Sequence, residues 1–157
     1  MRLPPNFHSR QSMDKKVIPN DIMLAEVGTL LEEGRDVKLT PLGNSMLPFI
    51  VGGKDSVTLR KLPEIKIGDI VLAHLADTRY VLHRVVAIDG DRLTLMGDGN
   101  LVGTEPCKKS DILGTIITIN GHKPAKGVIW GRLKPARRYL LVFYRHFRRL
   151  KRLLYEN

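Results

Sequence analysis

Hydrophobic positions follow a helical spacing near the start of the chain. Over residues 20–34 they recur about every 3.6 positions, which predicts an amphipathic helix. Asn20 or Asp21 can cap the beginning of this helix, and Gly34 can end it. Its apolar positions are Ile22, Leu24, Val27, Leu30 and Leu31. We expect this helix to cover one edge of a hydrophobic core.

The spacing changes beyond the helix to short apolar runs, rich in β-branched residues and separated by turns. This pattern is typical of β-strands, and Asp77-Thr78 and Gly90-Asp91 have the chemistry of hairpin turns. The expected strands lie in DVKLT, DSVTLRKL, IVLAHLA, YVLHRVVAID, RLTLMGD and DILGTIITING. Many closely spaced strands and few helices predict a mainly β, small barrel-like domain with an N-terminal helix.

The composition suits one domain with two tails. At 157 residues and 43% hydrophobic, the chain can bury one core. Residues 1–19 hold three prolines and no apolar period, so we expect a flexible lead-in. Residues 20–131 would form the β-rich domain, and residues 132–157 a basic amphipathic helix.

The positive charge is concentrated at the C-terminus. The chain carries a net charge of +10, and residues 132–157 hold nine Lys or Arg and one acid. The apolar positions of this segment at helical spacing are Leu140, Phe143, Phe147, Leu150 and Leu154. A basic helix with aromatic residues predicts that residues 136–157 bind an anionic membrane surface. Alternatively the apolar face packs on the β domain, or the segment binds an acidic protein; binding to nucleic acid has the least support.

Other features bear on the location of the protein. Cys107 is the single cysteine, so the chain forms no internal disulfide, which is compatible with a reducing compartment. No run approaches the roughly 20 apolar residues that span a bilayer, and the N-terminal stretch lacks the apolar core of a signal peptide. These features predict a cytoplasmic protein that can attach peripherally to a membrane.

A constrained turn holds the first candidate for chemistry. In PLGNSMLPFI, residues 41–50, Ser45 is surrounded by glycine and proline, which restrict the backbone and can hold one hydroxyl still. Serine is a weak nucleophile and needs a neighbouring base, for which His83 is a candidate because it shares a strand face with two valines. The alternatives are a serine that bonds only its own turn and a histidine that only fills the core.

A carboxylate that orients the histidine would complete such a site. Asp98 follows a predicted strand between Gly97 and Gly99, where a tight backbone can aim it at an imidazole. An ordinary Asx turn explains the same residue equally well. Glu105 lies a few residues further on and could serve the same purpose.

Four stretches together carry a resemblance to a known family. In order and spacing, residues 37–119 resemble the superfamily of signal peptidase I and LexA-like serine peptidases. The stretches are GNSMLP, KIGDIVLAHL, VLHRVVAIDGDRLTLMGDGN and DILGTI. His83-Arg84-Val85 is similar to the histidine branch, the endoplasmic-reticulum type of signal peptidase.

The resemblance implies a serine endopeptidase acting on an extended peptide, without a metal or another cofactor. It implies that Ser45 is the nucleophile, His83 the general base and Asp98 the best candidate for the orienting acid, with Glu105 as an imperfect substitute. Many relatives have a hydroxyl residue where this chain has Gly43. An oxyanion hole would therefore depend on backbone N–H groups near Gly43 and Asn44.

Two other functional classes stay open. The irregular acid and Gly43 would also suit a catalytically weak or inactive relative that binds peptides or regulates a partner. A self-cleaving repressor is less well supported, because the 36 residues before the first expected strand hold only one clear helix. No zinc site is expected, because the five histidines are widely scattered.

Overall fold

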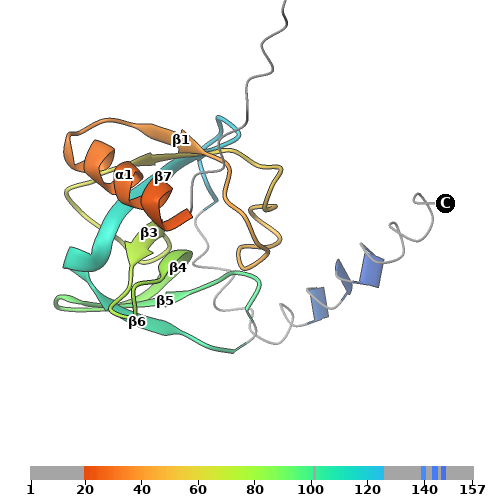
Figure 1. Ribbon diagram of the computed structural model, residues 1–157. Helices are drawn as coiled ribbons and strands as arrows, with labels where there is room; N and C mark the ends of the chain where they lie inside the picture. Colours follow the sequence, from red (N-terminus) through yellow and green to blue (C-terminus); the bar gives the residue numbers. More distant parts are fainter. Residues whose placement is uncertain (1–19, 101, 126–138, 141–142, 145, 148–157) are drawn as a thin grey trace, which may run out of the picture.

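The protein folds as one helix and an antiparallel β-sheet. The computed structural model describes residues 20–100, 102–125, 139–140, 143–144 and 146–147 (Figure 1). The elements are α1 (Asn20–Glu32), β1 (Val37–Leu39), β2 (Val57–Arg60), β3 (Ile70–His74), β4 (Tyr80–Asp89), β5 (Arg92–Met96), β6 (Glu105–Lys108), a short 3-10 helix (Lys109–Asp111) and β7 (Ile112–Ile119).

The seven strands form one sheet in the order β1-β2-β7-β3-β4-β5-β6, with antiparallel neighbours throughout. The mainly β class and the N-terminal helix are therefore confirmed. The sheet is not closed, because β1 and β6 lie at its two ends and each pairs with one neighbour (Figure 1). The expected barrel-like closure is corrected to an open sheet. The expected C-terminal helix over residues 136–157 lies largely outside the described residues.

Both faces of the sheet are covered by hydrophobic cores. Ile70 and Leu72 of β3 contribute to a first core with α1, and Val71 and Ala73 contribute to a second core with β4, β5 and β6. All four side chains are buried, because β3 lies in the middle of the sheet. Alternation along β4 likewise sends Val85 into the second core.

Helix α1 ends as the sequence predicts. Gly34 has a φ of +78°, and the next N–H, that of Arg35, donates to the Leu30 carbonyl at 3.1 Å. Leu31 is fully buried in the first core, against β7, where a Cβ on Gly114 would lie 2.9 Å from it. Within the described part of the chain, no helix has both the length and the apolar character needed to cross a membrane.

Candidate functional site

The serine turn, residues 41–50, connects β1 toward β2 and is anchored by its own apolar side chains. Met46 and Ile50 are buried in the first core. The N–H of Gly53 donates to the Pro41 carbonyl at 2.8 Å and closes the loop. Ser45 lies between these anchors with a half-buried side chain. The turn therefore holds Ser45 on a fixed backbone.

The GDGN turn, residues 97–100, packs against the backbone of the serine turn. The N–H of Gly99 donates to the Ser45 carbonyl at 2.7 Å. A Cβ on Gly97 would lie 2.6 Å from that same carbonyl oxygen, and one on Gly99 would lie 2.9 Å from the Asn44 carbonyl oxygen. Glycine is required at both positions because the two backbones approach so closely.

Asp98 is paired with Arg84. Its Oδ1 and Oδ2 accept hydrogen bonds from Arg84 Nε at 2.8 Å and Nη2 at 2.7 Å. Arg84 Nη1 also donates to the Gly68 carbonyl at 2.6 Å, and both partners of the ion pair are buried. A buried bidentate pair forms only when the guanidinium and the carboxylate have one relative orientation. It fixes the GDGN turn, and through it the serine turn, to β4.

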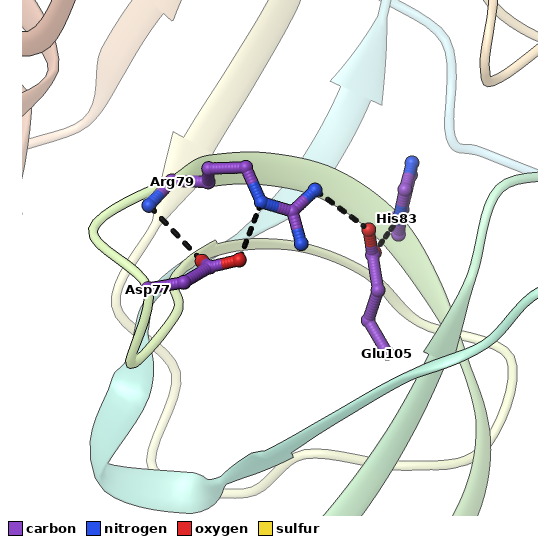
Figure 2. Close-up of polar contacts among 4 residues, drawn as sticks. All are labelled: Asp77, Arg79, His83 and Glu105. Carbon is purple, nitrogen blue, oxygen red and sulfur yellow. Dashed lines mark hydrogen bonds and ion pairs between the residues drawn. The ribbon is translucent and has the colours of Figure 1, made fainter.

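His83 is held by Glu105. The imidazole is buried on β4, opposite Val71 of β3, and its Nδ1 lies 2.5 Å from Glu105 Oε2 (Figure 2). Glu105 comes from β6, which pairs with β5 so that Glu105 faces Leu95. Of the two candidate acids, the structure brings Glu105 to His83 and engages both oxygens of Asp98 with Arg84.

Ser45 and His83 line the same cavity of about 150 Å³. The other lining residues are Pro41, Leu42, Gly43, Met46, Ile50, Gly52, Tyr80, Val81 and Leu82. Most of these side chains are apolar. Within the described residues no hydrogen bond joins the Ser45 hydroxyl to the imidazole, so the two side chains share a cavity without direct contact of that kind.

The backbone beside Ser45 offers free donors. Gly43 has a φ of +88°, a region that favours glycine, and its carbonyl leaves no room for a Cβ on Gly52, which would lie 1.8 Å away. In the part of the chain that the structure describes, the N–H groups of Asn44 and Ser45 donate to no protein acceptor. They are therefore available to an oxygen of a bound molecule.

Other candidate chemistry is limited. Among the described residues, no three side chains of His, Cys, Asp or Glu gather where they could hold a metal ion. Cys107 lies on β6, where burial raises the pKa of its thiol to about 11. At neutral pH this thiol stays protonated and is a poor nucleophile.

Two residues beside this site, Asp77 and Arg79, are not predicted from the sequence. Arg79 Nη1 lies 3.4 Å from Glu105 Oε1, and Arg79 Nε donates to Asp77 Oδ2 at 2.6 Å (Figure 2). Arg79 comes two positions after Asp77 in the hairpin between β3 and β4, so their pairing is local. Its contact with Glu105, 26 residues away, depends on the tertiary structure.

No protein-family model matches the chain, and no curated protein matches it with significant sequence similarity.

Proposed function

We propose that the protein is a serine endopeptidase of the signal-peptidase type, with Ser45 as nucleophile, His83 as general base and Glu105 as orienting acid. The observation that carries this proposal is that Ser45 and His83 line one cavity while Glu105 binds Nδ1 of the imidazole. A nucleophile, a base and a third group that orients the base form the arrangement of serine hydrolases.

Glu105 favours the productive form of His83. A carboxylate only accepts hydrogen bonds, so Glu105 Oε2 stabilises the tautomer with its proton on Nδ1. The lone pair is then on Nε2, where it can take the proton of Ser45. The mechanism requires the Ser45 hydroxyl to come within hydrogen-bond reach of Nε2 when substrate binds, and such contacts are commonly longer without substrate.

The proposed reaction proceeds through an acyl-enzyme. Ser45 Oγ attacks the scissile carbonyl carbon as His83 Nε2 takes its proton, and the carbonyl oxygen becomes an oxyanion. The N–H groups of Asn44 and Ser45, which donate to no protein acceptor in the described residues, are our candidate donors to this oxyanion. His83 then gives its proton to the leaving amine, and water releases the acyl group in the reverse sequence.

The cavity favours an extended peptide with a small apolar side chain. A volume of about 150 Å³ admits a small side chain, and Met46, Ile50 and Leu82 make it apolar. β1 (Val37–Leu39) ends close to the cavity and is an edge strand with an unpaired side. An extended substrate can pair with such an edge through its backbone.

The first test is cleavage of a degenerate peptide library. The wild-type protein is expected to generate new termini, detected by mass spectrometry, with small apolar residues enriched before the cut. Ser45→Ala, purified in parallel, should generate none. Cleavage that persists in Ser45→Ala would contradict the proposal, and binding of library peptides without cleavage by the wild type would favour the inactive, peptide-binding alternative.

We also propose that residues 136–157 bind an anionic membrane surface. Nine of the 26 Lys and Arg of the chain lie in residues 132–157 with only one acid. The described apolar side chains of this segment are exposed: Leu140 52%, Phe143 72% and Phe147 58%. Exposed apolar groups in a basic segment match the chemistry of an anionic bilayer interface.

Co-sedimentation with lipid vesicles tests this second proposal. The full chain is expected to co-sediment with vesicles that contain phosphatidylglycerol, and a chain truncated after residue 135 should lose this binding. Vesicles of phosphatidylcholine alone are the charge control, and the full chain should bind them at least about 10-fold more weakly because the electrostatic attraction is missing. Equal sedimentation of the full and truncated chains would refute the proposal.

A further inference from the structure

Arg79 is shared between two carboxylates beside the candidate site. Its Nε donates to Asp77 Oδ2 at 2.6 Å, and its Nη1 lies 3.4 Å from Glu105 Oε1. Glu105 uses its other oxygen, Oε2, for His83. Asp77, Arg79, Glu105 and His83 thus form a continuous polar chain from the β3–β4 turn to the imidazole (Figure 2).

The exposure of these groups argues against a role in stability alone. The Arg79 side chain is 58% exposed and that of Glu105 is 23% exposed. Ion pairs this accessible to water contribute little to the stability of the fold, because the solvent screens them. The same guanidinium nevertheless lies close to the one carboxylate that contacts His83, so its electrostatic effect is directed at the imidazole.

We propose that Arg79 is a positioning residue that holds Glu105 against His83, and that the sharing of Arg79 between Asp77 and Glu105 tunes the negative charge that Glu105 presents to the imidazole. This inference rests on the proposed function for its catalytic meaning. The electrostatic effect of Arg79 on the His83 ring can be measured without any substrate.

The sign follows from the charges. A carboxylate beside an imidazole and a cation beside that carboxylate act on the ring with opposite signs, so the Arg79 cation partly offsets the Glu105 charge. Removing the cation leaves the full negative charge beside His83, so His83 should keep its proton to higher pH. Removing the Asp77 charge should release Arg79 toward Glu105 and move the titration of His83 to lower pH.

The neighbouring charged groups do not replace Arg79. The Arg79 guanidinium holds the pKa of Asp77 below its usual range by hydrogen bonding, so Asp77 is charged at neutral pH and competes for Arg79. The facing elements contribute apolar Val71 from β3 and neutral Ser45 from the serine turn. The other titratable groups named nearby, among the described residues, are Arg84 and Asp98, which are paired with each other, and His74 and Tyr80, whose rings are stacked 4.3 Å apart. Cys107, on the same strand as Glu105, has its pKa raised to about 11 by burial and is neutral at neutral pH.

Proton NMR titration of the histidine rings in the full chain tests the inference. His83→Gln assigns the His83 signals. In Arg79→Gln, the titration midpoint of His83 is expected to rise by about 0.5–1 pH unit, the scale of one charge acting through a partly exposed neighbour. In Asp77→Asn, which keeps the Oδ1 acceptor for the Arg79 N–H, the midpoint should fall.

Lys66→Gln is the control for loss of one positive surface charge, because Lys66 is exposed and pairs with Glu64. Its His83 midpoint should stay within about 0.2 pH unit of wild type, because an exposed charge that is paired with Glu64 is screened by salt. Equal midpoints in Arg79→Gln and Lys66→Gln would overturn the inference. If the shifts occur but the peptide library is not cleaved, the proposed function fails while the Arg79 inference stands.

A pH–rate profile adds the catalytic readout. Where the wild type cleaves peptides, the acidic limb of the Arg79→Gln profile should move to higher pH by the same amount as the NMR midpoint. Its plateau rate should fall several-fold because Glu105 is held less firmly. An unchanged profile together with an unchanged NMR midpoint would show that Arg79 is only a surface group.

Discussion

Ser45→Ala and His83→Ala are each expected to lower kcat/KM for peptide cleavage by about 10⁴-fold or more, because nucleophile and base act as one unit. Glu105→Gln should lower kcat by about 10³–10⁴-fold, since an amide can hold the imidazole in the wrong tautomer. Circular dichroism should show folded protein in all three variants. Rates would be measured on one peptide identified from the library.

Glu33→Gln is the matched control for the loss of a carboxylate. Glu33 is exposed and 4.0 Å from Arg35, away from the cavity lining. Its kcat/KM should stay within about twofold of wild type, as expected for an exposed pair. An equally active Glu105→Gln would remove Glu105 from the mechanism, and activity near wild type in Ser45→Ala or His83→Ala would contradict the assignment of the site.

Arg84→Ala is expected to lower the free energy of unfolding by about 3–5 kcal/mol, because it leaves the Asp98 carboxylate buried without its cation. The Gly68 carbonyl loses a hydrogen-bond donor in the same variant. The measurement is urea denaturation followed by circular dichroism. Activity should fall as well, because the GDGN turn, which contacts the backbone of Ser45, is then no longer fixed to β4.

Arg60→Ala provides the matched exposed pair. Arg60 binds Asp36 with the same bidentate geometry, at 2.7 and 2.6 Å, but its side chain is 52% exposed. The loss of stability there should be far smaller than in Arg84→Ala, because water screens an exposed ion pair. Similar losses in Arg84→Ala and Arg60→Ala would contradict a structural role for the buried pair. Recovery of stability in the double variant Arg84→Met with Asp98→Leu would support that role.

The local elements could be predicted because their signals are local. The helical spacing before Gly34 and the alternation around Val37 and His83 correspond to α1, β1 and β4. Turn residues such as Gly90, with a φ of +58°, mark where hairpins reverse. The strand order and the open edges were not predictable in this way, because they depend on pairing between distant segments.

β6 had no sequence signal of its own. Its residues, EPCK, include a proline and a lysine and show no run of alternating apolar side chains. The strand exists because it pairs with β5, with Glu105 opposite Leu95. This non-local register carries Glu105 to His83, which explains why Glu105 ranked below Asp98 in the sequence analysis.

Asp98 has a clear local signal in the sequence, but its partner differs from the predicted one. A carboxylate between Gly97 and Gly99 is well placed to be aimed, and the structure aims it at Arg84, the neighbour of His83 on the other face of β4. The sequence predicts that a histidine and an acid lie together. It does not indicate which acid meets the histidine, because that depends on pairing between strands that are distant in the sequence.

The most direct test of the central claim is detection of an acyl-enzyme on Ser45. A peptide identified from the library would be incubated with the protein, the reaction quenched in acid, and the protein digested and mapped by mass spectrometry. The account predicts the N-terminal half of the substrate attached to the Ser45 side chain, and no such adduct in Ser45→Ala. Attachment to another residue, or turnover of the same peptide by Ser45→Ala, would contradict it.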